Sequence, residues 1–512
     1  MMFLSILFQR SEELFNDAAV SEPDCFADLN LDQIIESVTT GKEEYNLKPF
    51  FYYPLKNISN ILYRQEIMRD LEKESVMERI SEFSAKMKEI RRLLSRVAKL
   101  YYNYHRERWF LEVVEIYCKT IEELGDGLLR EDIKSAGLNS FREYLKSYIN
   151  SESYRLLVSE TKTIITGLSS IRYCVHYRDL RVQVRSFGSE TDYNREIESA
   201  FSKFKHDQVK NYMVEYASAS MDMNHVEAQI LDGVANLFPG IFSRLESFYN
   251  INRNFLDNTI IKFDREIQFY VAYLDYTRNL KKKGLKFCYP VVTKETKEIF
   301  NIEGYDLALA YKLINEKSGV VTNDFHLRGK ERTIIVSGPN QGGKTTFARM
   351  VGQLHYLASL GCPVAGEKSQ LFLFNKLFTH FEKEEKIQNL RGKLQDDLIR
   401  IHKILEEAGD ESIIILNEIF TSTTLQDQIF LSRKIMQRIT ELDLICIWVT
   451  FIDELASFSK SNVSMISKVV PENPSLRTFK IVRGPADGLA YAMSIAEKYR
   501  LNYESLRERL KL

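Results

Sequence analysis

The sequence predicts a mostly parallel α/β domain toward the C-terminus, preceded by a long all-α region. Three observations support this prediction. A short apolar run, a glycine-rich turn and a helical pattern follow one another over residues 333–360. From about residue 290 onward, short strand-like runs alternate with helical patterns, which is typical of α/β folds. Between about residues 73 and 281, apolar residues recur at steps of three and four, which is typical of long helices.

Composition is that of a globular protein of about two to four domains. The chain has 512 residues, of which 44% are hydrophobic and 28% charged, with a net charge of −1, so contact with nucleic acid would need a local basic patch. The six cysteines are scattered without a C-x-x-C pair, which disfavours a zinc site or a disulfide framework. No apolar run of about 18 residues and no signal peptide is recognisable, so we expect no membrane span and a cytoplasmic location.

Breaks in the pattern divide the chain into three predicted parts. Residues 1–72 form a small helical, connector-like module that Tyr53-Pro54-Leu55 interrupts. Residues 73–304 form a helical core and lever. Residues 305–512 form the α/β domain, in which the strand-like and helical runs alternate.

Two stripes of apolar residues mark long helices in the second part. Each stripe would bury one seam against a neighbouring helix, and two such helices far apart in sequence can pair as an antiparallel stalk or lever. The alternative is that both stripes belong to ordinary helical core. The first stripe comprises Ile80, Phe83, Met87, Ile90, Leu94, Val97 and Tyr101, and the second comprises Leu256, Ile260, Phe263, Ile267, Tyr270 and Leu274.

Residues 168–187 interrupt the helical pattern. The runs 171–178 and 180–185 each alternate apolar and polar positions around Asp179, which predicts a β-hairpin. One face of this hairpin carries arginines, with tyrosines alternating beside them. Such a face can contact a phosphate backbone, and a merely solvated face is the alternative.

The stretch from Gly338 to Thr346 fits the phosphate-binding pattern G-x-x-x-x-G-K-[ST]. Glycines let the backbone approach phosphate with its N–H groups turned inward, and the following helix N-terminus adds a favourable dipole. Lys344 would neutralise phosphate charge and the Thr345 hydroxyl would bind Mg²⁺, so the predicted cofactors are ATP and Mg²⁺. The predicted nucleotide-binding residues are Gly338, Pro339, Asn340, Gln341, Gly342, Gly343, Lys344, Thr345 and Thr346.

A second candidate segment lies at Asn417 and Glu418, directly after the apolar run Ile413–Leu416. In P-loop ATPases an Asp at the first position holds the Mg²⁺ shell, and a Glu beside it polarises the attacking water. An amide at Asn417 brings no negative charge, so we expect weaker metal binding, through a metal-bound water, and slower turnover. Glu418 remains the general-base candidate. The predicted catalytic residues are Glu418, Asn417 and Lys344, and the predicted metal-binding residues are Thr345 and Asn417.

Taken in order, these motifs resemble the MutS family of DNA mismatch-repair ATPases. Gly338–Thr346 is similar to the family's G-P-N-M-G-G-K-S-T loop, in which Pro-Asn is unusual among P-loops generally. Val321-Thr-Asn-Asp324 resembles its V-P-N-D. Ile415-Leu-Asn-Glu418, followed by Thr421-Ser-Thr-Thr424, resembles its L-M-D-E-x-x-x-G-T-S-T. The resemblance implies an ABC/MutS-like P-loop ATPase domain preceded by a helical core and lever.

The resemblance also implies a homodimer through the ATPase domains, in which a signature segment of the partner completes each nucleotide site. The corresponding stretch here is Asn389–Leu398. Gly392 and Lys393 stand where the family has Ser and Thr, and a backbone N–H or the Lys393 ammonium is the hypothesised substitute for the serine hydroxyl. The residues expected near the dimer face are Thr423 and Thr424.

Two further departures from the family bear on function. Phe451 stands where the family has a histidine that senses the γ-phosphate, which again favours slow hydrolysis. The first 72 residues contain no F-x-E, the aromatic wedge of mismatch readers, and Phe110-Leu-Glu112 fits the letters only inside a predicted helix. We therefore expect a shortened member that lacks the mismatch-recognition domain, with no nuclease-like domain after the ATPase.

The predicted function is that of an ATP-binding protein with slow, DNA-dependent ATPase activity, acting as an ATP-gated clamp on duplex or branched DNA. Binding to DNA would place it at the nucleoid. The alternative is a non-hydrolysing ATP switch, a scaffold with protein or RNA partners. Asn417 and Phe451 favour this alternative, whereas the retained Glu418 speaks against it.

Overall fold

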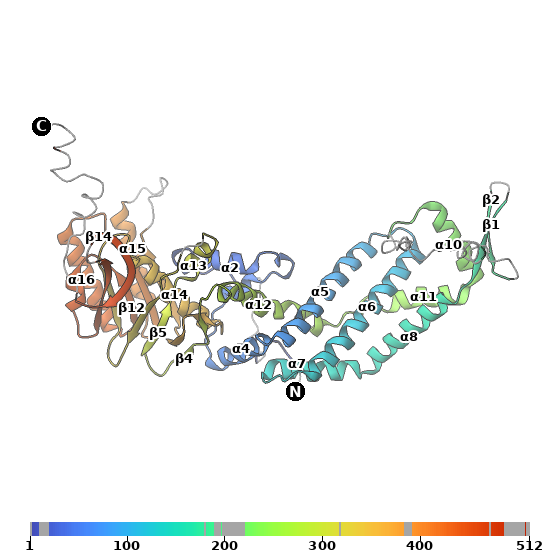
Figure 1. The fold of residues 1–512 in the computed structure, drawn as a ribbon, viewed down its shortest axis with the longest axis horizontal. Coiled ribbons are helices and arrows are strands. Elements are labelled where there is room, and N and C mark those ends of the chain that lie inside the picture. The colour runs from blue at the N-terminus through green and yellow to red at the C-terminus, as the bar shows by residue number, and fades with distance from the viewer. Residues whose placement is uncertain are drawn as a thin grey trace, which may run out of the picture. The chain divides into compact units, whose positions relative to one another are not determined.

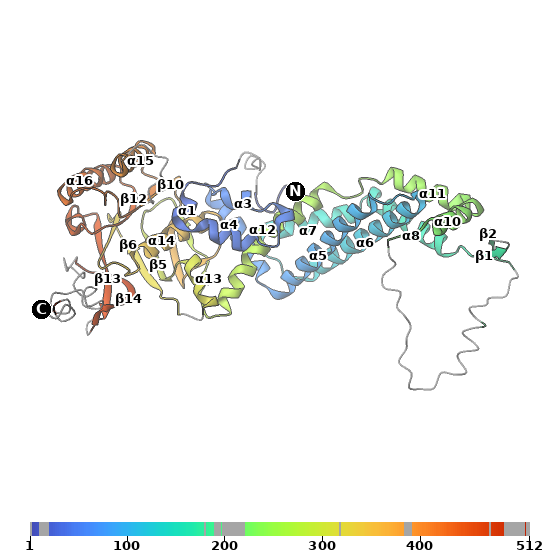
Figure 2. The same ribbon diagram turned by 90° about the horizontal axis from the view of Figure 1, so that it is seen from above.

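The computed structural model divides the chain into two compact units, a helical unit and an α/β unit (Figures 1 and 2). The helical unit contains Glu74–Asp132 and Ser140–Asp264. The α/β unit contains Leu4–Lys73, Ile133–Asn139 and the chain from Arg265 onward. The residues described are 3–9, 20–178, 181–188, 196, 221–316, 319–382, 392–470, 473–485 and 507.

The helical unit is built on α5 (Glu74–Val97) and α6 (Asn103–Arg130), which pack side by side (Figures 1 and 2). The members of the first apolar stripe are buried as far as Val97, except Leu94, which is only half-buried and whose neighbour Leu93 is buried instead. Tyr101 is 88% exposed because α5 ends before it, so this residue does not belong to the stripe. Within the part of the chain that is described, no helix is both long and apolar enough to cross a membrane. The helices that follow are α7 (Ala136–Ile149), α8 (Glu152–Ser169), α10 (His225–Leu237) and α11 (Pro239–Ile251).

The second apolar stripe lies in α12 (Asn258–Lys281) from Ile260 to Leu274, and these members are buried. Leu256 precedes the helix and is only half-buried, so this residue does not belong to the stripe. The two predicted stripes do touch, since the rings of Phe83 and Phe263 lie 6.0 Å apart between centroids. The extensive packing of α5 is nevertheless with α6, its neighbour in sequence. A short connection between consecutive helices makes them natural packing partners, which the stripes alone did not reveal.

A β-hairpin stands where the alternating pattern predicted one. Strands β1 (Tyr173–Arg178) and β2 (Arg181–Ser186) pair antiparallel, with Val175 opposite Val184 and Cys174 opposite Arg185. Opposed residues share a face, so the polar positions of both strands lie together on one side. The Asp179 of the predicted turn lies outside the described residues.

The α/β unit is organised around a six-stranded sheet in the order β10-β11-β12-β7-β13-β14. Its first five strands run parallel, and β14 returns antiparallel to β13. The predicted mostly parallel sheet is thereby confirmed. The strands are β7 (Thr333–Ser337), β10 (Lys376–Phe381), β11 (Ser412–Asn417), β12 (Ile445–Val449), β13 (Asn462–Val470) and β14 (Asn473–Arg483).

Helices cover both faces of the central strands, and every residue of β7, β11 and β12 is buried. Ile414 and Trp448 join one apolar cluster with α15 and α16. Ile415 points to the other face, where Gly352 of α14 leaves room for it. Successive strand residues face opposite sides, so the continuous apolar run of β11 serves both helical layers. These helices are α14 (Lys344–Ser359), α15 (Lys393–Glu407) and α16 (Leu425–Glu441).

A four-stranded sheet in the order β4-β9-β5-β6 accompanies the main sheet. Helix α13 (Leu307–Asn315) follows β5, and β6 contacts β14 at the edge of the main sheet. This contact brings Asn323 beside the strand that faces the glycine-rich loop. The smaller strands are β3 (Phe287–Cys288), β4 (Val291–Thr293), β5 (Ile299–Gly304), β6 (Asn323–Leu327), β8 (Val364–Ala365) and β9 (Lys368–Phe372).

The N-terminal helices pack into the α/β unit. Arg64 is fully buried there and donates to the backbone carbonyls of Leu7 (3.0 Å) and Leu360 (3.1 Å), the latter directly after α14. The predicted boundaries at 72 and 304 remain predictions about independent folding. The helices are α1 (Cys25–Leu29), α2 (Leu31–Thr39), α3 (Lys48–Tyr52) and α4 (Ile58–Leu71).

Asp28 of α1 connects three elements of the α/β unit. Its buried carboxylate accepts hydrogen bonds from the Thr379 hydroxyl on β10 and from Arg400 Nη2 on α15, each 2.7 Å long. Its backbone carbonyl accepts a 3.0 Å bond from Arg349 Nε on α14. One short helix therefore fixes the helix after the glycine-rich loop relative to β10 and α15.

We expect Asp28→Asn to lower the free energy of unfolding by about 3 kcal/mol, because it leaves the Arg400 charge half-buried without its carboxylate. Asp24→Asn, an exposed position on the same segment, is the matched control and is expected to change it by less than about 0.5 kcal/mol. Urea denaturation of both variants measures the difference. Equal midpoints for Asp28→Asn and Asp24→Asn would contradict a stabilising role for Asp28.

Candidate nucleotide-binding site

The loop that follows β7 adopts a backbone that only glycine accommodates easily. Gly338 and Gly343 have φ angles of 115° and 90°, and Gly343 is the N-cap of α14. Gly342 has no room for a side chain because Ser467 of β13 lies against it, donating a 2.7 Å hydrogen bond to the Gly342 carbonyl. The loop is thus held from outside by its carbonyls, and the N-terminus of α14 opens toward the pocket described below.

Lys344, the first residue of α14, is buried at the base of the loop with 4% of its surface exposed. Its ammonium donates to the carbonyls of Gly338 (2.9 Å) and Pro339 (3.3 Å). It also lies 3.6 Å from Glu418 Oε1 and 4.0 Å from the ring centroid of Phe451. Burial lowers the pKa of Lys344, and the Glu418 carboxylate partly offsets this. A buried cation in this position favours the arrival of an anion.

Thr345 and Asn417 meet at the carboxyl end of β11. The Thr345 hydroxyl donates to Asn417 Oδ1 over 3.0 Å. Both oxygens suit Mg²⁺, but neither is charged, so these residues fit a loosely held ion. Elsewhere in the described ranges, no three His, Cys, Asp or Glu side chains gather to hold a metal ion. The predicted metal-binding pair is therefore brought together, without a carboxylate of its own.

Glu418 adopts a left-handed backbone with a φ of 53°, which is uncommon for a residue with a side chain. Its N–H still donates to the Val449 carbonyl of the neighbouring strand over 3.0 Å. Because of its left-handed backbone, the chain turns sharply at this residue as it leaves β11. This turn places the Glu418 carboxylate beside Lys344, at the phosphate end of the site. Phe451 lies across the same ammonium and presents no polar group to it.

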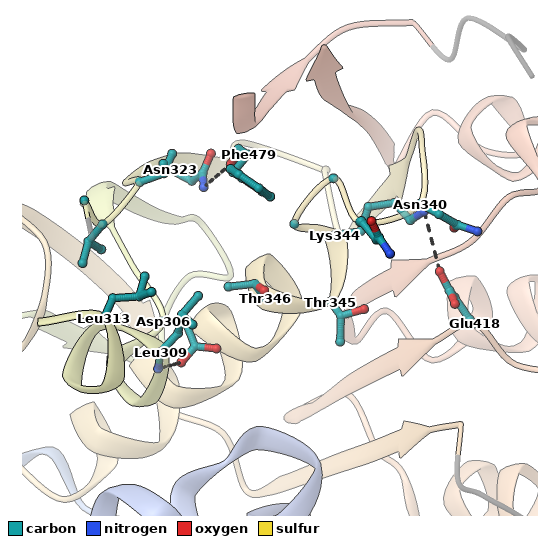
Figure 3. Close-up of a pocket in the computed structure, with 16 residues that line it drawn as sticks. Asp306, Leu309, Leu313, Asn323, Asn340, Lys344, Thr345, Thr346, Glu418 and Phe479 are labelled. Carbon is teal, nitrogen blue, oxygen red and sulfur yellow. Dashed lines mark hydrogen bonds and ion pairs between the residues drawn. The ribbon is translucent and has the colours of Figure 1, made fainter. Parts of the chain in front are cut away.

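A pocket of about 760 Å³ opens beside the loop, a volume suited to a small-molecule ligand. Figure 3 shows Lys344 and Glu418 at one end and Leu309 and Leu313 of α13 at the other. The charged end suits phosphates, and the apolar end suits a planar base. Of the predicted loop residues, Asn340–Thr346 line this pocket.

Sequence analysis assigned no role in the pocket to the wall opposite the loop. Two signals were available: the segment Val321–Asp324, which contains Val321 and Asn323, and the spacing of Leu309 and Leu313, one helical turn apart. Asn323 fixes this wall to β14 by donating to the Phe479 carbonyl over 3.1 Å and accepting from the Ile481 N–H over 2.7 Å. The wall consists of Asp306, Leu309, Leu313, Gly319, Val320, Val321, Asn323 and Phe479.

The candidate signature segment is described only in part, since Asn389–Arg391 lie outside the described residues. Gly392 is the N-cap of α15, and the Lys393 ammonium pairs with the Glu382 carboxylate. The proposed contact of Lys393 with a partner subunit thus remains a prediction. The Thr424 side chain accepts a hydrogen bond from the Asp427 N–H and so caps the N-terminus of α16.

Comparison with known proteins places this site in a defined family of domains. Residues 334–504 match the family model of MutS domain V. The chain is 22% identical to the DNA mismatch repair protein MutS of Thermotoga petrophila over 501 residues, covering 91% of this chain and 61% of that protein. It therefore spans about three fifths of the length of that relative.

Other relatives match over shorter stretches of the chain. The chain is 29% identical to Endonuclease MutS2 of Thermus thermophilus over 192 residues, which are 36% of this chain and 25% of that protein. It is 26% identical to the DNA mismatch repair protein MSH3 of Yarrowia lipolytica over 199 residues, which are 38% of this chain and 20% of that protein.

We expect Lys344→Ala to abolish the rise in melting temperature that ATP causes, because stabilisation by a ligand requires binding to the folded state. The unliganded variant should melt below the parent, because the change leaves two loop carbonyls and the Glu418 carboxylate without the ammonium. Lys376→Ala is the matched control, as this exposed lysine pairs with Glu407 away from the pocket. Thermal scans without and with ATP measure the melting temperature of each unliganded variant and the rise that ATP causes. An unchanged ATP effect in Lys344→Ala would refute the assignment of Lys344 to phosphate binding.

Proposed function

We propose that this chain, which belongs to the MutS family, binds ATP at the loop Gly338–Thr346, hydrolyses it slowly and acts as an ATP-gated clamp on DNA. The proposal includes a homodimer formed through the α/β units, as the family resemblance implies. Mg²⁺ is the expected second cofactor, with Thr345 as a protein ligand and Asn417 acting through a metal-bound water.

The observation that carries the proposal is the convergence of three segments on one pocket. Lys344 supplies a buried positive charge, and the N-terminus of α14 supplies N–H groups for phosphate oxygens. Thr345 and Asn417 lie within hydrogen-bonding distance of each other at the same end. The apolar wall at α13 then leaves the base a separate place to bind. This polarity fits a nucleoside triphosphate better than an inorganic anion alone.

Slow hydrolysis follows from the residues at the phosphate end. Glu418 would position the attacking water, which requires its carboxylate to be drawn away from Lys344 by the arriving phosphates. Asn417 contributes no charge to a metal ion, and Phe451 offers no hydrogen bond to a phosphate oxygen. Losing one preorganised polar group commonly lowers a rate by about 10²–10³-fold, so turnover should be far below that of a complete site.

We expect Glu418→Gln to reduce steady-state ATP hydrolysis by about 10²-fold while leaving ATP affinity within about threefold, because the amide cannot act as a base. Glu411→Gln, on the segment that leads into β11, is the control and should keep full turnover. Phosphate release and calorimetry provide the two measurements.

The same experiment decides between the two candidate functions. If the parent chain binds ATP and shows no turnover that depends on Glu418, the non-hydrolysing switch is favoured. The stacking of Phe451 on Lys344 is the specific observation in favour of that second candidate. If ATP does not bind at all, both candidates fail.

The hairpin of β1 and β2 is the proposed DNA contact in the helical unit. Arg181 and Arg185 are exposed, and the exposed tyrosines Tyr173 and Tyr177 stand on the opposite face. Arginines at such a surface neutralise phosphates and release counterions from the duplex. Binding of this kind is independent of sequence and depends strongly on salt.

We expect the double change Arg181→Gln and Arg185→Gln to weaken DNA binding and to reduce the slope of log K against log salt by about 2, since each phosphate contact contributes about 0.9. Changing Arg92 and Arg96, two exposed arginines of α5, to Gln is the matched control. Fluorescence anisotropy with a branched DNA over a salt series measures the slopes. Failure of the parent chain to bind DNA at low salt would move the proposal to a protein or RNA partner.

A further inference from the structure

The β1–β2 hairpin of the helical unit has two chemically different faces. Residues directly opposite each other in an antiparallel pair share a face, and the register of this pair separates the side chains by type. Arg181 and Arg185 lie on one side, which we call the arginine face. The other side, called the aromatic face below, carries Tyr173, Val175, Tyr177, Val182 and Val184.

Most of the aromatic face is open to solvent. Tyr177 is 74% exposed and Tyr173 is 46% exposed, and Val182 is 40% exposed. Val184 is partly covered, because Gly233 of α10 lies so close that a Cβ there would come within 3.0 Å of its side chain. Helix α10 therefore supports the hairpin, which projects past it at the end of the helical unit (Figures 1 and 2). Exposed apolar side chains gathered on one face mark a surface that binds a partner.

The charge of the hairpin indicates the kind of partner. Within residues 171–178 and 181–188, the parts of the hairpin that are described, Arg is present and Asp, Glu and Lys are absent. Exposed arginines complement a polyanion, and tyrosine rings complement the flat faces of nucleobases. An apolar protein surface would suit the aromatic face alone, whereas a nucleic acid suits both faces.

A regular DNA duplex cannot contact both faces in this way. Its phosphates are accessible from outside, but its bases are stacked within the helix and present only their edges in the grooves. An unpaired strand exposes the faces of its bases, on which aromatic side chains can stack. A branch point, where a duplex meets an unpaired strand, offers phosphates and base faces side by side. The two opposed faces of a single hairpin match this arrangement.

We propose that the hairpin binds at a branch point of DNA, with its arginine face on duplex phosphates and Tyr173 and Tyr177 stacked on unpaired bases. The inference rests on the proposed function, because it takes the arginine face as a DNA contact. It specifies the class of DNA as a fork or flap with an unpaired arm. The two tyrosines stand four residues apart on one strand, or about 13 Å, so each contacts a different base.

The first test compares a blunt duplex with a fork of the same number of nucleotides, using fluorescence anisotropy and the full chain. We expect Tyr177→Ala to weaken binding of the fork by about tenfold and of the duplex by less than about twofold, because stacking is lost only where bases are unpaired. Tyr177→Phe keeps the ring and should bind the fork like the parent. Tyr101→Ala is the matched control, since this tyrosine is 88% exposed and lies between α5 and α6.

A salt series distinguishes stacking from charge. Tyr177→Ala should leave the slope of log K against log salt unchanged, because an uncharged ring releases no counterions from the phosphates. The double change of Arg181 and Arg185 should reduce that slope on both DNAs. Melting of each variant without DNA checks that the fold is kept, which we expect for Tyr177→Ala because the ring is 74% exposed.

A fluorescent base reports the stacking directly. The probe is the fork with 2-aminopurine at the first unpaired position, whose emission falls when the base stacks. The parent chain and Tyr101→Ala should quench this emission on binding. At a protein concentration that saturates the fork, Tyr173→Ala combined with Tyr177→Ala should not quench it. Full quenching by that double variant would overturn the assignment of the tyrosines to base stacking.

The outcomes separate this inference from the proposed function. If Tyr177→Ala binds the fork like the parent, or weakens binding of fork and duplex equally, the branch-point contact is wrong while DNA binding by the arginine face stands. If the parent chain binds neither DNA at low salt, the DNA clamp of the proposed function itself fails. Tighter binding to a matched forked RNA than to the DNA would likewise overturn the choice of DNA as partner.

Discussion

The burial of the Lys344 charge is the constraint on which the rest of the site depends. An ammonium with 4% exposure would be costly without partners, and its partners are two loop carbonyls and one carboxylate. Each of these requires its own backbone geometry. The carbonyls of Gly338 and Pro339 face the ammonium because the loop turns at glycine, and Glu418 reaches it through a left-handed turn. The loop and the end of β11 are therefore held around a buried positive charge that an anion could neutralise.

The same loop is supported from its helical side by segments far away in sequence. Asp28 forms hydrogen bonds with α14, β10 and α15. Arg64 donates a hydrogen bond to the carbonyl of Leu360, the residue directly after α14. Both side chains are buried, and both act on backbone or side-chain groups of elements that carry the pocket. Movement of α14 on binding a ligand would have to carry these contacts along or break them. The N-terminal helices thus belong mechanically to the nucleotide-binding fold.

Two substitutions relative to the family's motifs bear on the balance between nucleotide binding and hydrolysis. Asn417 and Phe451 remove one charge and one polar group from the machinery of hydrolysis, whereas Glu418 is kept. Under the proposed function, these two changes would favour holding a nucleotide over hydrolysing it.

Much of the fold could be predicted from local pattern. Continuous apolar strands beside a glycine-rich loop specified the parallel sheet, because only a strand covered on both faces tolerates such a run. Alternation around residue 179 specified the hairpin in the same way, through the two-residue period of a strand. The pairing of α5 with α6 was not predicted, since a heptad stripe identifies a buried seam but not its partner. The inclusion of residues 4–73 in the α/β unit was not predicted either, because a local sequence pattern does not identify the element that a helix packs against.

The sequence by itself determined the candidate residues of the phosphate end, because Lys344, Thr345, Asn417 and Glu418 belong to motifs whose spacing reflects strand, turn and helix. Only the tertiary structure decided what surrounds them. Phe451 stacking on Lys344, Arg477 bonding to the loop and Leu309 facing the pocket all join segments distant in the chain. No local period encodes such contacts, because they arise from the order of strands in the sheet and the packing of its edges.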